Sequence, residues 1–269
     1  MLLASGLTLV LGILGVPNFA QGHLYMLGAY LCYYLVMPYA INYWLSLILV
    51  TIALGLMGLI IERLIFRPMR DAPEVNLFVA ALGLLMVLEG GALYLFGPRS
   101  KYIVTSFSRE VIEVADLAFP VQRLIVIGGT IIVMICLWLF TKKTTLGAAL
   151  EATAQNRQGA MLCGIKVRTI TAMAFAIGTA LAGVAGVLVA PSLQVNPHMG
   201  LGPLLIAFAA VIFGGLGSVP GAVLGGFVMA IVESLASGYI SAKYSWVFIF
   251  LILIMVMMFR PAGLLRRTA

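Results

Sequence analysis

The stretch TKKTTLGAALEATAQNRQGAMLCGIKVRT, residues 141–169, is the longest polar run in the second half of the chain, and apolar stretches of membrane-spanning length lie on both sides of it. Such a run between two spans lies at a membrane surface. Its spacing predicts a short helix from Leu146 to Cys163, capped at the start by Thr145 and ended by Gly164 in a left-handed turn. Residues 142–168 are called the surface segment below.

Small side chains occupy one face of this predicted helix. Ala149, Ala152, Asn156, Ala160 and Cys163 recur at helical spacing and form a face with almost no side-chain bulk. Larger apolar side chains lie on the other side, and basic residues flank the helix: Leu150, Met161 and Ile165, with Lys142, Lys143, Lys166 and Arg168. This pattern suits a rigid helix that fits into a groove of another protein. The alternative is an ordinary loop between two spans that happens to be helical.

The composition indicates an integral membrane protein. The chain has 269 residues, of which 63% are hydrophobic and 9% charged, whereas soluble domains are about 45–50% apolar and about 25% charged. Apolar segments recur along the whole chain, so we expect residues 1–269 to form a single membrane domain with no room for a soluble catalytic one. The net charge of +7 fits basic residues that face a membrane surface. No Lys/Arg-rich run with interleaved aromatic residues supports nucleic-acid binding.

The predicted fold class is an all-α polytopic membrane protein. We expect about eight to nine hydrophobic transmembrane segments, some of them short or interrupted. They are residues 2–16, 23–41, 43–61, 77–96, 121–140, 169–190, 203–213, 222–235 and 244–259. No basic region precedes the first apolar segment, so no cleavable signal peptide is expected.

Glycine and proline interrupt the apolar pattern in two places. Residues 17–22 break the first apolar stretch, and such a break marks either a discontinuous helix near a pathway or a tight turn between ordinary spans. Residues 12–17 (GILGVP) resemble residues 215–220 (GLGSVP). The similarity indicates either an internal repeat or a chance match between glycine-rich stretches.

Acidic and small residues inside the apolar segments predict contacts between helices. Glu89 and Glu233 lie within predicted spans, and an acid at the centre of a span costs about 3 kcal/mol on insertion, so both should face protein rather than lipid. Two rows of small residues spaced four apart predict close helix packing. The rows are Gly178, Ala182 and Gly186, and Gly217, Gly221 and Gly225.

The distribution of basic residues predicts the orientation, because they accumulate on the cytoplasmic side. One side collects Arg63, Arg67, Arg70, Lys142, Lys143, Arg157, Lys166, Arg168, Arg260, Arg266 and Arg267. The other side has Arg99, Lys101, Arg109, Arg123 and Lys243. The surface segment and the C-terminus are therefore expected in the cytoplasm.

Motifs for chemistry within the chain are absent from the sequence. There is no G-x-x-x-x-G-K-[ST] run to hold a nucleotide, no H-E-x-x-H or Cys/His cluster for a metal, and no nucleophile with an evident base nearby. An enzyme is therefore not expected. A glycine-rich helix bundle with buried acids, interrupted helices and a docking element is typical of a transporter.

Several stretches carry a family resemblance over nearly the whole length, in the family's order. They are NFAQGHLYMLGAY (18–30), ERLIFRPMR (62–70), GAALEATAQNRQGAMLCGI (147–165), FAIGTALAGVAGVL (175–188), NPHMG (196–200), AFAAVIFGGLGSVPGAVLGGFVMAIVE (207–233) and FRPAGLL (259–265). The chain resembles the membrane permeases of branched-chain amino acid ABC importers, LivH type. In that family Ala148 and Glu151 stand where basic residues are common, and Gln21 where a histidine is common.

The resemblance implies a set of partners and sites. The partners are a homologous second permease, two cytoplasmic ATPase subunits that bind ATP and Mg²⁺, and an extracytoplasmic binding protein; this chain itself holds no cofactor. It implies a multi-pass protein of the bacterial inner membrane, with the surface segment presented to an ATPase. The coupling residues are then Gly147, Ala149, Ala152, Asn156, Gly159, Ala160 and Gly164. Candidates for the pathway or for helix packing are Asn18, Gln21, Glu89, Gly217, Gly221, Gly225 and Glu233.

The expected activity is ATP-driven import of branched-chain amino acids by alternating access. One alternative keeps this machinery but changes the cargo to urea, short amides or another small polar solute. The other is a stand-alone secondary carrier in which Glu89 or Glu233 binds the coupling proton.

Overall fold

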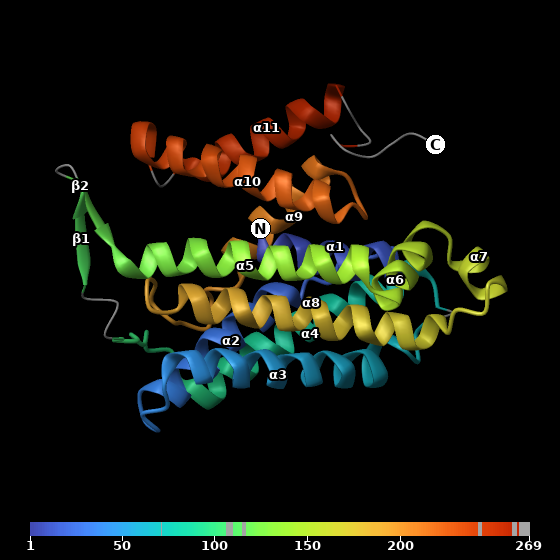
Figure 1. The fold of residues 1–269 in the computed structure, drawn as a ribbon, viewed down its shortest axis with the longest axis horizontal. Helices are drawn as coiled ribbons and strands as arrows, with labels where there is room; N and C mark the ends of the chain where they lie inside the picture. Colours follow the sequence, from blue (N-terminus) through green and yellow to red (C-terminus); the bar gives the residue numbers. More distant parts are fainter. Residues whose placement is uncertain (71, 106–109, 115–116, 242–243, 260–262, 264–269) are drawn as a thin grey trace.

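The computed structural model describes residues 1–70, 72–105, 110–114, 117–241, 244–259 and 263. Most of its helices lie side by side along the long axis of the molecule (Figure 1). Among the described residues, five helices are long and apolar enough to cross a membrane. They are α3 (Tyr43–Ile61, continued by the π-helical turn η1, Glu62–Phe66), α4 (Glu74–Phe96), α5 (Val121–Lys143), α8 (Val167–Val189) and α10 (Val219–Ala236, continued by the π-helical turn η3, Ser237–Ser241).

Shorter helices correspond to the remaining predicted apolar segments. They are α1 (Leu2–Leu14), α2 (Gln21–Val36), α9 (Leu201–Gly214) and α11 (Ser245–Phe259). Each predicted apolar segment is thus a helix, and the all-α polytopic class is confirmed. The largest difference in boundaries is that α2 ends at Val36 rather than near Ile41. Smaller ones include the start of α4 at Glu74 and the end of α5 at Lys143, each three residues beyond its predicted bound.

The predicted polar loop from 97 to 120 contains a small antiparallel hairpin. Strands β1 (Val111–Val114) and β2 (Leu117–Pro120) pair with Val111 opposite Pro120. Pro120 ends the hairpin and directly precedes α5. The hairpin projects from one end of the bundle (Figure 1), which is called the hairpin end below.

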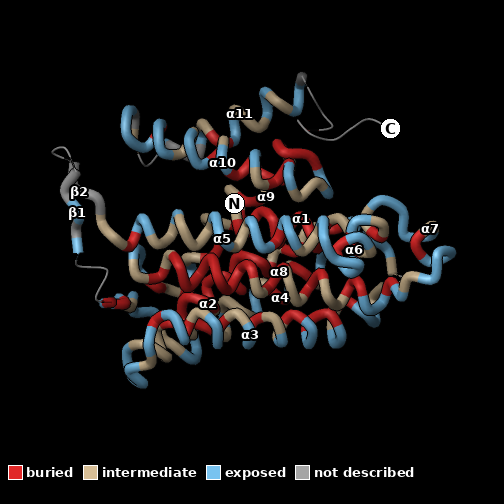
Figure 2. Tube along the Cα trace, viewed as in Figure 1, coloured by how far each residue is buried: buried red, intermediate tan, exposed pale blue. Residues whose placement is uncertain are grey.

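Helix α8 lies at the centre of the bundle. It packs against α1, α2 and α3. In its most apolar stretch of 18 residues 67% is buried, compared with 6% in the corresponding stretch of α5. Figure 2 shows the contrast as a buried α1 and α8 beneath a largely exposed α5. Exposed apolar side chains along α5 suit contact with lipid, whereas the core of the protein surrounds α8.

Small residues let the backbones in this core approach closely. A Cβ on Gly6 of α1 would lie 2.8 Å from the carbonyl oxygen of Gly178, and one on Gly186 would overlap the backbone of Tyr25 in α2. Ala182, the remaining member of that row, is fully buried. The row on α8 is therefore a helix-packing surface, as its spacing predicts.

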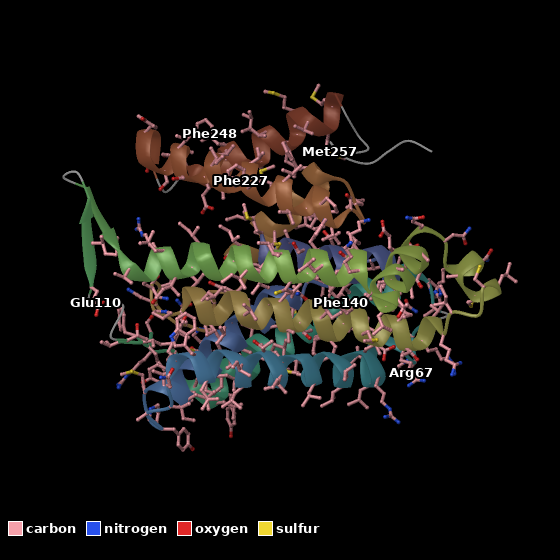
Figure 3. All side chains as sticks on the ribbon, in the orientation of Figure 1. Arg67, Glu110, Phe140, Phe227, Phe248 and Met257 are labelled. Atoms are coloured by element: carbon pink, nitrogen blue, oxygen red, sulfur yellow. The ribbon has the colours of Figure 1, made fainter. Side chains whose placement is uncertain are left out.

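The basic segments that are predicted to be cytoplasmic lie at one end of the molecule. Figure 3 labels Arg67, which follows η1, near the end opposite Glu110, which precedes the hairpin. Arg67, Arg70 and Arg157 line one small cavity there, although Arg157 is far from the other two in sequence. This end is called the α7 end, after the short helix α7 (Arg157–Leu162). Arg260, Arg266 and Arg267 lie outside the described residues.

Candidate functional site

The surface segment forms two helices, so the prediction of one helix from Leu146 to Cys163 is wrong. Helix α6 covers Thr145–Gln155 and is followed by α7. The break falls at Asn156, which has an extended backbone and whose side-chain Oδ1 accepts a 2.8 Å hydrogen bond from the Gly159 N–H. Asparagine competes for backbone donors in this way and therefore starts a helix more readily than it continues one.

The caps of the surface segment also differ in part from the prediction. Thr144, not Thr145, caps α6: its Oγ1 accepts a 3.0 Å hydrogen bond from the Gly147 N–H. Adjacent threonines make the two positions hard to tell apart in sequence. At the other end, Gly164 has a φ of +80°, the left-handed turn that was predicted there.

Part of the small-residue face of the segment turns toward its own chain, while Asn156 and Cys163 are exposed. Ala160 is 4% exposed and Ala149 and Ala152 are half-buried, so the prediction that Ala160 belongs to a free face is wrong. Gly147 lies directly against α5, where a Cβ would overlap the Phe140 carbonyl oxygen. The small side chains therefore let α6 and α7 pack closely onto the bundle. The free apolar surface consists instead of Leu146, Met161 and Leu162, of which Leu162 is 90% exposed.

A buried acid links the surface segment to η1. Glu62, the first residue of η1, is 3% exposed and faces a cavity of about 30 Å³ that Arg67, Arg70 and Arg157 also line. Arg157 is the first residue of α7. A movement of α7 would therefore change the electrostatic environment of Glu62 at the end of α3.

Two helices begin inside the bundle rather than at its surface. The Gln21 side chain, in the first residue of α2, donates a 2.6 Å hydrogen bond from Nε2 to the carbonyl oxygen of Gly178, the central residue of α8. Gly22 packs against Gly200, the residue that precedes α9. Of the two readings of the break at residues 17–22, the structure therefore favours the discontinuous helix.

Polar side chains line this interior junction of α2 and α9. Asn18 is 1% exposed and accepts a hydrogen bond from the Ala20 N–H, and Gln21 and His23 are fully buried. Asn18 Nδ2 and Gln21 Oε1 have no hydrogen-bond partner among the described residues. Buried polar groups without partners are uncommon and mark places where water or a ligand can bind.

Glu89 joins the junction from α4. Its Oε1 lies 2.5 Å from Nδ1 of His198 in the loop before α9, and its Oε2 lies 3.3 Å from Nε2 of His23 in α2. The acid therefore faces protein, as expected for a carboxylate in a span. Sequence reasoning missed both histidines. The signal in the sequence was the small number of such residues: the chain has two histidines, and two acids lie within predicted spans, so a contact between them was one of few combinations.

Glu233 has a different environment. It is half-buried on α10, and no hydrogen bond or ion pair of its carboxylate occurs among the described residues. Of the two acids expected to face protein, only Glu89 has identified partners. The two are therefore not equivalent.

The second glycine row joins α9 to α10. A Cβ on Gly221 would overlap the backbone of Gly214, and one on Gly225 would overlap that of Ala210. Gly217 has a φ of +84° and lies beside Gly12, so the two similar stretches 12–17 and 215–220 are neighbours in space. The adjacency leaves the question of an internal repeat open, because a shared contact surface also explains it.

These features define a class: a polytopic helical membrane protein in which two interrupted helices and a polar cluster lie inside the bundle. The chain belongs to the family described as the branched-chain amino acid transport system / permease component, whose profile matches residues 1–257. No solved structure matches the chain.

Two curated relatives are similar over almost their full length. The high-affinity branched-chain amino acid transport system permease protein LivH of Escherichia coli K12 is 32% identical, over 99% of this chain and 91% of the relative. BraD of Pseudomonas aeruginosa, named as a permease of the same kind of system, has the same identity and coverage. A more distant relative, the autoinducer 2 import system permease protein LsrC of Escherichia coli O9:H4, is 30% identical over 60% of this chain.

Proposed function

We propose that this chain is the membrane permease subunit of an ATP-driven importer for branched-chain amino acids in the bacterial inner membrane. The observation that carries the proposal is the 32% identity to two branched-chain amino acid permeases across 99% of the chain. The whole chain acts as one permease domain with a homologous second permease, two cytoplasmic ATPases and an extracytoplasmic binding protein. ATP and Mg²⁺ bind to the ATPases, and this chain needs no cofactor of its own.

The surface segment carries the coupling to the ATPases in this proposal. Met161 and Leu162 offer the apolar contact, while Gly147, Ala149, Ala152, Gly159, Ala160 and Gly164 give the segment its compact shape and Asn156 its bend. Closure of the ATPases moves α6 and α7, and the bundle rocks around the interior junction of α2 and α9. The α7 end and the C-terminus face the cytoplasm, consistent with the excess of basic residues there.

Reconstituted transport tests this function. The complete transporter is placed in vesicles with its binding protein, and initial uptake of radiolabelled leucine, urea and a short amide is measured with and without ATP. We expect ATP-dependent uptake of leucine. Uptake of urea or the amide instead would change the cargo, and leucine uptake driven by a proton gradient without ATP would replace the importer with a secondary carrier.

A further inference from the structure

We propose that Glu89, held between His23 and His198, binds the ammonium group of the amino acid as it crosses the membrane. The inference rests on the proposed function and deepens it, because it names the group that recognises the substrate within the permease. It uses residues that meet only in the fold: His23 on α2, Glu89 on α4 and His198 in the loop between α8 and α9.

The geometry leaves the carboxylate able to accept more donors. One imidazole nitrogen lies against each oxygen, at 2.5 Å and 3.3 Å. Only the His198 contact is a hydrogen bond, since neither ring nitrogen of His23 has a hydrogen-bond partner among the described residues. An ionised carboxylate has about four acceptor positions on its two oxygens, so about three remain. The Glu89 side chain is 32% exposed, so these positions are accessible from outside the chain.

The charge of the cluster favours a cation. The groups beside the Glu89 carboxylate are the imidazoles of His23 and His198, and neither is a permanent cation like the side chain of arginine. Among the described residues no lysine or arginine forms an ion pair with Glu89, in contrast to the Lys142–Glu151 pair on the surface segment. An ammonium group carries a full positive charge that attracts the carboxylate, whereas urea is neutral, and this attraction gives the site a preference for amino acids over urea.

The surroundings leave space for the bound group. Gly90 and Gly91 follow Glu89 on α4, and a Cβ on either would meet no other atom within 4 Å. His198 is 70% exposed and lies two residues before Gly200, where α9 begins. The carboxylate is thus partly exposed at the surface of the chain, next to the interior junction of α2 and α9. It is about 22 Å along α4 from Glu74, at 1.5 Å per residue, and so is well inside the span.

Two probes separate the ammonium group from the rest of leucine. Isopentylamine is leucine without its carboxylate, and isocaproate is leucine without its ammonium group. In the complete transporter, with binding protein already loaded with leucine, we expect isopentylamine to inhibit ATP-driven uptake and isocaproate to have no effect. Equal inhibition by both probes, or no inhibition by the amine, would overturn the assignment.

Substitutions test whether Glu89 is the residue that binds the ammonium group. Glu89→Gln should lower leucine uptake by about tenfold or more and abolish inhibition by the amine, since it removes a charged hydrogen bond. Glu74→Gln, at the exposed acid that begins the same helix, should leave both unchanged. Stimulation of ATP turnover by loaded binding protein should persist in both variants, which shows that they still assemble. Unchanged uptake by Glu89→Gln, or equal losses in both variants, would contradict the proposal.

A binding measurement tests the site independently of transport. Isopentylamine should raise the melting temperature of the purified complete transporter, and Glu89→Asp should keep part of this shift because it keeps the charge. If the wild-type transporter moves no leucine but shows the shift, the proposed cargo is wrong and the ammonium site stands. If it moves leucine and shows no shift, the ammonium site is wrong and the proposed function stands.

Discussion

Gly22 and Gly200 lie backbone against backbone where α2 and α9 begin, and a Cβ on either would overlap the carbonyl oxygen of the other. The contact joins two chain segments that each carry a histidine beside Glu89, His23 directly after Gly22 and His198 two residues before Gly200. The spacing of the two histidines therefore depends on two residues without side chains. Packing of this kind stabilises helix association inside a membrane, where the hydrophobic effect contributes little.

A methyl group at Gly22 is expected to force the two helix starts apart. Gly22→Ala should destabilise the assembled transporter by about 1–3 kcal/mol, the usual cost of overpacking, and should reduce uptake. Thermal unfolding in detergent and vesicle uptake measure the two effects. The matched control is Gly83→Ala on α4, where a Cβ would meet nothing within 4 Å. Equal thermal stability and equal uptake of the two variants would show that the contact between Gly22 and Gly200 does not stabilise the transporter.

The contact between α9 and α10 gives a second test of glycine packing. Gly221→Leu should separate the helices, because even a Cβ there overlaps the backbone of Gly214, and folded protein should fall. Gly238→Leu in η3, where a Cβ has no neighbour within 4 Å, should accumulate normally. Yield of monodisperse protein after purification measures both. Normal yield of the Gly221 variant would be inconsistent with close approach of α9 and α10.

The membrane helices were predictable because a bilayer demands long apolar runs, and that demand is local in sequence. The junction was not, since Glu89 is 66 residues from His23 and 109 from His198. Nothing in the periodicity of α4 indicates which helix faces the acid. The residues of the glycine rows were found by spacing, but their partners, such as Gly214 for Gly221, required the fold.

The surface segment illustrates a different limit. Helical spacing predicts one face for Ala149, Ala152 and Ala160, but Ala160 lies on a separate helix, α7. Spacing also cannot tell whether a face is turned toward solvent or toward the chain itself. The bend at Asn156 depends on one side-chain hydrogen bond that competes with continuation of the helix. The small side chains predict a docking surface, and of them Ala160 is buried against its own chain.

Asn156 is expected to hold the angle between α6 and α7. Asn156→Ala removes the cap of α7 and should destabilise that helix by about 1 kcal/mol, while Asn156→Asp should retain it because its carboxylate can accept the same bond. Hydrogen exchange at the amides of 159–162 measures the difference, with faster exchange in the alanine variant. Equal exchange in both variants would show that the side chain does not stabilise α7.

Cysteine accessibility tests the orientation. In a background without Cys32, Cys136 and Cys163, Gln155→Cys at the α7 end should react with an impermeant thiol reagent only from the cytoplasmic side. Ser192→Cys, in the exposed loop after α8, should react only from outside. Reaction of both from the same side would contradict the topology that the basic residues predict.

Leu162 is expected to make the principal apolar contact with an ATPase. It is 90% exposed at the end of α7, next in sequence to the 51% exposed Met161, so the two side chains offer apolar surface to a partner. Leu162→Asp should therefore leave insertion and folding intact, because the side chain is almost fully exposed, yet abolish co-purification with the ATPases and stimulation of their ATP turnover. The control is Leu193→Asp, at a 51% exposed leucine of the loop at the hairpin end, which should retain both. If Leu162→Asp retains ATPase binding and stimulated turnover, the contact lies elsewhere and the surface segment is only a connection between α5 and α8.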